Sequence, residues 1–232
     1  MRMRVFWFKW NGWKHFAYDF FIIQIGFALF GVAIDIIVKA SVGLDSWDVF
    51  QMALTYHIPI TLGESSIGVA LVVVLFDAFL GERLGWGTIA NAIFIGMWVD
   101  LLRPITPTVP MIVPVQIAYL LLGVLIMGFA TAIYIGVDAG AGPRDTLMLG
   151  ISRVGRVSVR VARTCIEVSV VVLGWILGGP VWIGTLVAAF AIGPAVQFAF
   201  KVLGIHPKLL HSSKDATVDS DDSSTCQTPS ST

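Results

Sequence analysis

The stretch GLDSWD, from Gly43 to Asp48, has a counterpart 97 positions later, where the chain reads GAGPRD from Gly140 to Asp145. The same ungapped offset gives six glycine pairs in all: Gly26/Gly123, Gly31/Gly128, Gly43/Gly140, Gly81/Gly178, Gly87/Gly184 and Gly96/Gly193. With 23 glycines in 232 residues, chance gives roughly 0.7 such pairs between positions 26 and 96. The sequence therefore predicts two related halves.

The composition is that of a chain surrounded by lipid. Hydrophobic residues make up 56% of it and charged residues 13%, with a mean hydropathy of +0.84. Soluble domains carry about a quarter charged residues, so water is not the main solvent of this chain. The formal net charge is zero, which gives no basis for binding nucleic acid. We expect an integral membrane protein with the lipid bilayer as its main partner.

Apolar runs mark the expected membrane spans. A bilayer core needs roughly 20 helical residues, and the clearest runs cover residues 17–38 and 113–137. Shorter candidates cover residues 65–81, 86–102, 164–178 and 182–200. Because lipid offers no hydrogen-bond partners, each span must be helical. We expect an all-α integral membrane protein of about six transmembrane helices.

The distribution of Lys and Arg predicts the orientation. With six spans and both termini cytoplasmic, 13 of the 15 basic residues lie inside, and only Lys39 and Arg103 lie outside. Residues 17–112 and 113–203 then form two repeats of three spans, and an odd number of spans makes the repeats inverted. Residues 1–16, basic and rich in Trp, are expected at the membrane interface. Residues 204–232 are expected to be a disordered cytoplasmic tail.

The two motifs open short segments, residues 46–58 and 143–155, that are too short to span a bilayer. They are either re-entrant half-helices, whose N-terminal amides meet a substrate, or interfacial helices that lie flat on the membrane. In the second case Asp48 and Asp145 are ordinary first-turn acids that offset the helix dipole. Both interpretations are open at this point.

Acidic residues inside apolar runs are candidates for function. Three of them have a basic residue at helical spacing, which favours local pairing: Asp35 with Lys39, Asp100 with Arg103, and Glu167 with Arg163. Asp77 has no such neighbour, so it needs a partner on another helix, a water-filled cavity or a proton, or else it snorkels to the cytoplasmic face. The polar residues Asn91, Gln24, Gln116 and Gln197 favour hydrogen bonds between helices.

The motifs resemble those of the YczE/YyaS/YitT group of bacterial membrane proteins over about residues 17–203. The resemblance is carried by Gly43, Trp47, Asp48, Gly140, Gly142, Pro143, Arg144 and Asp145, with Gly87-Thr88 and Gly184-Thr185. The first motif departs from the second, with Asp45-Ser46-Trp47 in place of Gly142-Pro143-Arg144. The resemblance implies a multi-pass protein of the bacterial plasma membrane and points to no particular substrate.

The leading hypothesis is a small secondary transporter or permease for a small solute of unknown identity. The first candidates for binding a substrate or ion are Trp47, Asp48, Asp77, Arg144 and Asp145, with Asp77 as a possible proton carrier. Secondary candidates are Asp35, Asn91, Asp100 and Glu167.

The alternative hypothesis is an accessory or scaffold protein that does not transport. Its Arg-rich loop, with Arg153, Arg156 and Arg160, would then bind anionic lipid or a cytoplasmic protein, unless the loop only enforces topology. The sequence contains no nucleophile-and-base set, no metal-ligand spacing and no cofactor motif. We therefore expect no enzymatic activity, no catalytic residue, no metal and no cofactor.

Overall fold

The computed structural model describes residues 6–7, 13–82, 84–137 and 139–204. The predictions for the basic start of the chain, including an interfacial position, fall almost entirely outside these residues. The prediction of a disordered tail after residue 204 lies outside them as well.

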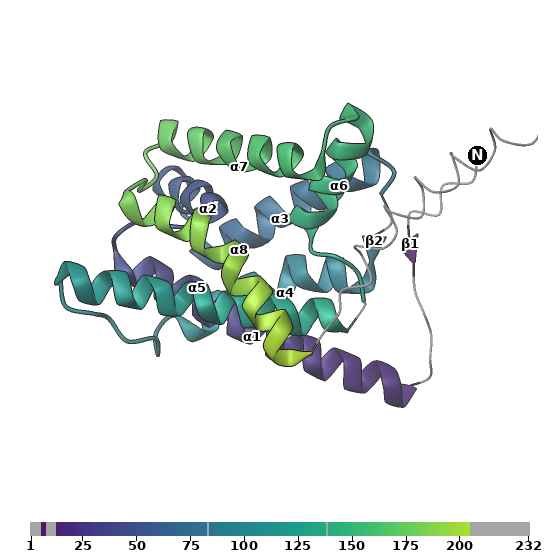
Figure 1. Ribbon diagram of the computed structural model, residues 1–232, viewed down its shortest axis with the longest axis horizontal. Helices are drawn as coiled ribbons and strands as arrows, with labels where there is room; N and C mark the ends of the chain where they lie inside the picture. Colours follow the sequence, from purple (N-terminus) through teal and green to yellow (C-terminus); the bar gives the residue numbers. More distant parts are fainter. Residues whose placement is uncertain (1–5, 8–12, 83, 138, 205–232) are drawn as a thin grey trace, which may run out of the picture.

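Within the described ranges the protein is helical (Figure 1). The helices are α1 (Trp13–Ala40), α2 (Ser46–His57), α3 (Leu62–Phe79), α4 (Trp86–Leu102), α5 (Val113–Gly136), α6 (Pro143–Gly155), α7 (Val159–Ile176) and α8 (Ile183–Leu203). Two short strands, β1 (Phe6–Trp7) and β2 (Leu84–Gly85), pair in parallel. The all-α prediction is confirmed.

Helix boundaries recur at the spacing of the sequence repeat. The starts of α2, α3 and α4, at positions 46, 62 and 86, recur 97 positions later at the starts of α6, α7 and α8, at positions 143, 159 and 183. Backbone conformation recurs too, because Gly43 and Gly140 both have a positive φ, of 127° and 125°. The sequence repeat is therefore also a repeat of local structure.

Four helices are long and apolar enough to cross a membrane: α1 over residues 15–40, α3, α5 and α8. The apolar helix α4 has 17 residues. Helix α7 matches α3 in length but carries three charged side chains, Arg160, Arg163 and Glu167. The chain is therefore a multi-pass membrane protein, and the number of its spans, from four to six, depends on whether α4 and α7 cross the membrane.

The expected starts of α3 and α7, at residues 65 and 164, are wrong by three and five residues. Both helices begin at a hydroxyl N-cap that hydropathy does not detect. The Thr61 side chain accepts from the backbone N–H of Glu64 within a capping box, and Ser158 accepts from the N–H of Val161. The helices therefore extend into polar sequence at these ends.

The helices pack as two layers (Figure 1). One layer holds α1, α4, α5 and α8, with α1 and α5 packed along each other; the other holds α2, α3, α6 and α7. In the second layer α2 packs on α7 and α3 on α6, so that each half contacts the other. Contact between α3 and α4 joins the layers.

Candidate functional site

The loop before each short helix is held by the opposite half of the chain. The backbone N–H of Gly184, in the first turn of α8, donates to the carbonyl of Val42 at 2.8 Å. At the related positions, the N–H of Gly87 in α4 donates to the carbonyl of Ala139 at 3.0 Å. Two equivalent hydrogen bonds thus hold the loop before α2 against the second half and the loop before α6 against the first half. We call these two contacts the crossings.

Threonine side chains strengthen both crossings. Thr185 Oγ1 accepts from the N–H of Leu44 at 3.2 Å, and Thr88 Oγ1 donates to the carbonyl of Ala141 at 2.7 Å. A Cβ at Gly43 would lie 2.5 Å from the backbone nitrogen of Thr185, so a side chain does not fit there. The paired Gly-Thr motifs of the sequence therefore act as docking points for the opposite loop.

These crossings bring the N-termini of α2 and α6 to one cavity of about 430 Å³. Neither N-cap residue, Asp45 or Gly142, bonds the first turn of its helix with a side chain. Polar lining residues come from both halves and both layers: Asp45, Ser66, Asn91, Thr131, Tyr134, Arg144, Asp145, Arg163, Glu167 and Gln197. We call this space the central cavity.

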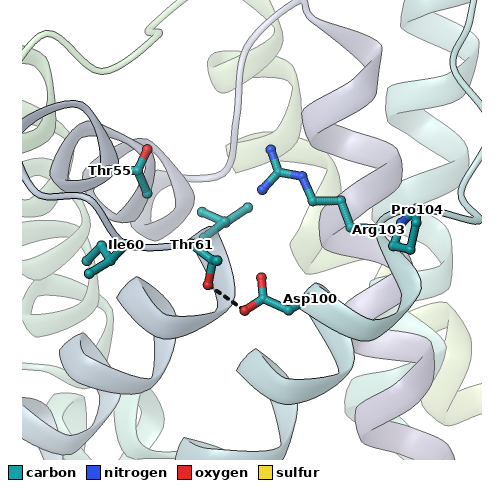
Figure 2. Close-up of a pocket in the computed structure, with 7 residues that line it drawn as sticks. Thr55, Ile60, Thr61, Asp100, Arg103 and Pro104 are labelled. Carbon is teal, nitrogen blue, oxygen red and sulfur yellow. Dashed lines mark hydrogen bonds between the residues drawn. The ribbon is translucent and has the colours of Figure 1, made fainter.

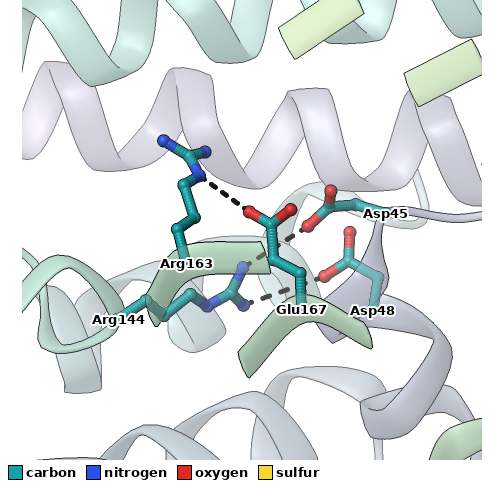
Figure 3. Close-up of polar contacts among 5 residues, drawn as sticks. All are labelled: Asp45, Asp48, Arg144, Arg163 and Glu167. Carbon is teal, nitrogen blue, oxygen red and sulfur yellow. Dashed lines mark hydrogen bonds and ion pairs between the residues drawn. The ribbon is translucent and has the colours of Figure 1, made fainter. Parts of the chain in front are cut away.

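Arg144 joins the two motifs across the central cavity (Figure 3). Its Nη1 lies 3.6 Å from Oδ2 of Asp45, and its Nη2 lies 4.0 Å from Oδ1 of Asp48. The guanidinium carbon sits 5.0 Å from the centroid of the Trp47 ring, a cation–π contact. Because the ion pairs exceed hydrogen-bond distance, Arg144 is held mainly by charge and stacking.

Asp48 is fully buried, and within the described part of the chain neither carboxylate oxygen has a hydrogen-bond partner. Burial raises the pKa of Asp48 to about 7, the charges of Asp45 and Asp35 add to this rise, and Arg144 opposes it. A buried carboxylate without donors is more stable with a proton. Asp48 is thus able to exchange a proton near neutral pH.

Asp145, the equivalent residue of the second half, has a hydrogen-bond donor, which Asp48 lacks. The Tyr134 hydroxyl donates to its Oδ2 at 3.3 Å. Burial raises the pKa of Asp145, while Arg163, the Tyr134 hydrogen bond and Arg144 hold it down. The two acids of the repeat therefore have different environments.

Most of the sequence-predicted site is brought together. Trp47, Asn91, Arg144, Asp145 and Glu167 line the central cavity, and Asp48 lies beside it, facing Arg144. The pairing of Arg163 with Glu167 is confirmed, with Nε 2.8 Å from Oε1.

Sequence reasoning missed Asp45, Tyr134 and Arg163 as lining residues. Asp45 lies within the first motif, which was a usable signal. Tyr134 was visible only as a residue of an apolar run, and Arg163 only as the expected partner of Glu167.

Asp77 lies elsewhere in the protein. It is fully buried, so the snorkelling alternative is wrong, and its carboxylate has no hydrogen-bond partner among the described residues. It shares a helix face with Ser66 and Ala70, which line the cavity, but lies seven residues beyond Ala70. Asp77 is therefore about 10 Å along α3 from the cavity wall.

The predicted pairing of Asp35 with Lys39 is wrong for this structure. Lys39 Nζ donates instead to the carbonyls of Arg103 and Thr106. Asp35 is left buried, with no hydrogen-bond partner for either oxygen in the described ranges. Helical spacing allowed the pair, but the end of α4 offers Lys39 free carbonyl groups.

The predicted pairing of Asp100 with Arg103 is also wrong. Asp100 accepts a hydrogen bond from the Thr61 hydroxyl at 2.5 Å (Figure 2). It accepts a second from the N–H of Gly63 at 3.0 Å. It therefore fastens the end of α4 to the first turn of α3.

Arg153, Arg156 and Arg160 have different roles in the structure. Arg153 forms an ion pair with Glu82 at 2.7 Å and donates to the carbonyl of Leu80. Arg156 and Arg160 are exposed, Arg156 with a left-handed φ of 51° just after α6. Of these three arginines, Arg156 and Arg160 have no ion pair with a described residue and stay candidates for contact with a lipid or partner.

Comparison with known proteins supports the predicted resemblance. A Haemophilus influenzae protein described as an uncharacterized protein is 33% identical over 192 residues, which is 81% of this chain and 86% of the relative. The uncharacterized membrane protein YczE of Bacillus subtilis is 29% identical over 185 residues, 78% of this chain and 84% of YczE. The uncharacterized protein YyaS of the same organism is 23% identical over 187 residues, 78% of this chain and 92% of YyaS.

No solved structure matches the chain. Residues 17–201 match the model of a family of unknown function, DUF6198, and this range includes both motifs and every residue that lines the central cavity. The chain therefore belongs to the DUF6198 family of unknown function, and it is a membrane protein related to YczE and YyaS.

Proposed function

We propose that this protein is a small secondary transporter of the bacterial plasma membrane that works by alternating access. In this proposal α1, α3, α4, α5, α7 and α8 span the membrane as two inverted repeats, with both termini cytoplasmic. Helices α2 and α6 are re-entrant, and the central cavity between their N-termini is the substrate site. Sites of this kind, at the interface of inverted repeats, are typical of secondary transporters.

The observation that carries the proposal is a difference between equivalent helix pairs. In the first half, α3 and α4 are in backbone contact, since a Cβ at Gly63 would lie 2.2 Å from the carbonyl oxygen of Gly96. Asp100 adds its hydrogen bonds to Thr61 and Gly63 at the same ends. We call this closed contact the α3–α4 gate, and in the proposed topology it faces outward.

The second half has Ser158, Arg160, Gly193 and Gln197 at the positions equivalent to Thr61, Gly63, Gly96 and Asp100. Here α7 and α8 are separate: a Cβ at Gly193 would meet nothing within 4 Å, although both helices line the central cavity. Figure 1 shows α8 diverging from α7 after the connection between them. We call this open pair the α7–α8 gate.

Alternating access through two inverted repeats requires that one gate is closed while the equivalent gate of the other repeat is open. In the proposed topology the structure is inward-facing. The outward-facing state exchanges the conformations, with α7 closed on α8 and α3 separated from α4. Pro194, next to Gly193, interrupts the hydrogen bonding of α8 and gives that helix a place to bend.

The test uses a cysteine in the cavity, and no substrate has to be known. In a variant without the native Cys165 and Cys226, Ser66→Cys is treated with a membrane-impermeant maleimide from each side. We expect labelling from both sides. A disulfide between Ser158→Cys and Gln197→Cys should block the cytoplasmic reaction, and one between Thr61→Cys and Asp100→Cys should block the external reaction. Labelling from one side only, unaffected by either disulfide, would reject the transport mechanism.

A second candidate function is that of a membrane scaffold, favoured by the exposed Arg156 and Arg160. Their side chains are free to contact anionic lipid headgroups. Replacing both with Gln, and comparing binding to vesicles with and without anionic lipid, tests this role. Equal binding by the variant would remove it.

A further inference from the structure

The central cavity offers hydrogen-bond donors that lack acceptors. Arg144 carries five N–H donors, and in the described structure none of them makes a hydrogen bond, since its nearest carboxylate oxygens are 3.6 and 4.0 Å away. Helices α2 and α6 add first-turn amides that no N-cap side chain satisfies. Arg144, itself in the first turn of α6, and the first-turn amides of α2 and α6 therefore lie at one space, as expected for a site that holds an anion.

The same space contains one carboxylate that lacks donors. The Asp48 side chain is 1% exposed and points at the Arg144 guanidinium (Figure 3). Neither of its oxygens accepts a hydrogen bond from any described residue. Among the described residues the charged groups that act on it are Asp45, Arg144 and Asp35, so Arg144 is the one cation in this part of the chain that favours its ionised form.

These two observations are linked, because a ligand anion and Asp48 compete for the same guanidinium. We propose that the central cavity binds a small organic carboxylate together with one proton: Arg144 and the N-termini of α2 and α6 hold the carboxylate, and Asp48 takes the proton. The inference rests on the proposed function only in taking this cavity as the transport site. Its proton carrier is Asp48 and not Asp77, the carrier that the sequence suggested.

The charges of the lining disfavour an anion that carries more than one charge. Asp45, Asp145 and Glu167 line the cavity, and the cations among the described lining residues are Arg144 and Arg163, of which Arg163 is already paired with Glu167. These acids repel a phosphate dianion more strongly than a carboxylate, which carries one charge and can take two parallel hydrogen bonds from one guanidinium. Phe30, Trp47, Ile95 and Met127 supply apolar contacts for the organic part.

Electrostatics explains why Asp48 takes up a proton when the anion binds. When a carboxylate draws Arg144 away, Asp48 loses the cation that stabilises its charge while remaining buried, so its proton affinity rises. One proton moves from solution onto an Asp48 oxygen as one anion binds, and no other bond changes. The pair enters the cavity with no net charge, which lowers the cost of moving it through the protein.

The experiment measures binding and proton uptake on purified protein in detergent. The probes are acetate, lactate and succinate, with acetamide and ethylammonium as neutral and cationic counterparts, and inorganic phosphate as the competing anion. Binding is followed by tryptophan fluorescence and by thermal shift, and proton uptake by a pH dye in weak buffer. We expect a monocarboxylate to bind with about one proton per anion, and the counterparts to have no effect.

Two variants locate the effect. Arg144→Gln should weaken binding by about tenfold to a hundredfold, the range for hydrogen bonds to a charged group. Asp48→Asn should bind the carboxylate without proton uptake. Arg153→Gln, which changes an arginine outside the cavity, is the matched control and should behave as the wild type. Trp47→Phe identifies which part of the fluorescence change comes from the stacked ring.

The outcomes separate this inference from the proposed function. Binding of ethylammonium or phosphate in place of the carboxylates, binding without proton uptake, or no binding by any carboxylate overturns the inference. Each of these leaves the cysteine accessibility test of alternating access intact. Conversely, proton-linked carboxylate binding in a protein labelled from one side only would keep the inference and reject transport.

Discussion

Nη1 of Arg144 lies 3.6 Å from Oδ2 of Asp45, and the two residues belong to opposite halves of the chain. Asp45 corresponds to Gly142, and Arg144 corresponds to Trp47, over which its guanidinium lies. A repeat that was symmetric at these positions would have no such contact. The departure of the first motif from the second therefore creates one asymmetric charged site out of two equivalent loops.

The crossing hydrogen bonds should contribute measurably to stability. Thr185→Val leaves the buried N–H of Leu44 without its acceptor, and we expect a loss of about 1–3 kcal/mol in unfolding free energy. Thr88→Val should cost a similar amount, because it leaves the carbonyl of Ala141 without its donor. Denaturant titration in mixed micelles measures both effects.

Thr164→Val is the matched control for these two variants, because its hydroxyl bonds within its own helix, to Arg160, and is exposed. We expect its loss to stay below about 0.5 kcal/mol. Equal losses in all three variants would show that crossing the halves adds no stability.

The sequence predicted the helical class, the repeat and five of the residues that line the cavity, because each depends on local or periodic information. The position of Trp47 relative to Arg144 follows from the glycine and threonine pairs, which mark where each loop docks. The hydrogen-bond partners of Lys39 and Asp100 could not be predicted in this way. Helical spacing permits several partners, and carbonyl groups at a helix end compete with the nearby acid.

The α3–α4 gate predicts opposite effects for two equivalent glycines. Gly63→Ala places a methyl group 2.2 Å from a backbone carbonyl oxygen, where nothing flexible can move aside, and should destabilise by about 1–3 kcal/mol. The methyl group of Gly96→Ala would lie 2.4 Å from the carbonyl oxygen of Gly63, so this variant should be destabilised by a similar amount. Gly193→Ala meets nothing and should be neutral or slightly stabilising in this state, since Ala favours a helix. Thermal unfolding of the three variants checks this, and a loss at Gly193 equal to that at Gly63 would contradict it.

Stability should fall as pH rises toward neutrality, in part because of Asp48. Its pKa in the folded protein, about 7, exceeds its ordinary value, so the folded state binds more protons than the unfolded state between these two values. The contribution of Asp48 to the unfolding free energy therefore decreases as the pH rises through this window, and it levels off above pH 7. We expect a smaller fall of Tm between about pH 5 and 8 in Asp48→Asn than in the wild type.

Asp19→Asn, which changes an acid in the second turn of α1, serves as the control for Asp48→Asn and should keep the wild-type slope. The same linkage applies to the carboxylate site. If one proton accompanies each anion, apparent affinity should fall about tenfold per pH unit once the pH exceeds the pKa of Asp48. Affinity independent of pH in this range would separate anion binding from Asp48.

If the proposed transport cycle holds, Asp100→Asn should shift the protein toward the outward-facing state of that cycle. The carboxylate of Asp100 accepts from Thr61 and Gly63 across the α3–α4 gate, and a charged acceptor forms stronger hydrogen bonds than an amide. Loss of about 1–2 kcal/mol from the closed gate would raise external labelling of Ser66→Cys by roughly five- to thirtyfold. Gln197→Ala changes the equivalent residue of the gate that is already open, so it should leave external labelling no higher than in the parent protein. Faster external labelling with Asp100→Asn alone would identify the Asp100 contact as the bond that keeps the cavity closed to the outside, whereas equal rates in both variants would assign that closure to the Gly63–Gly96 contact.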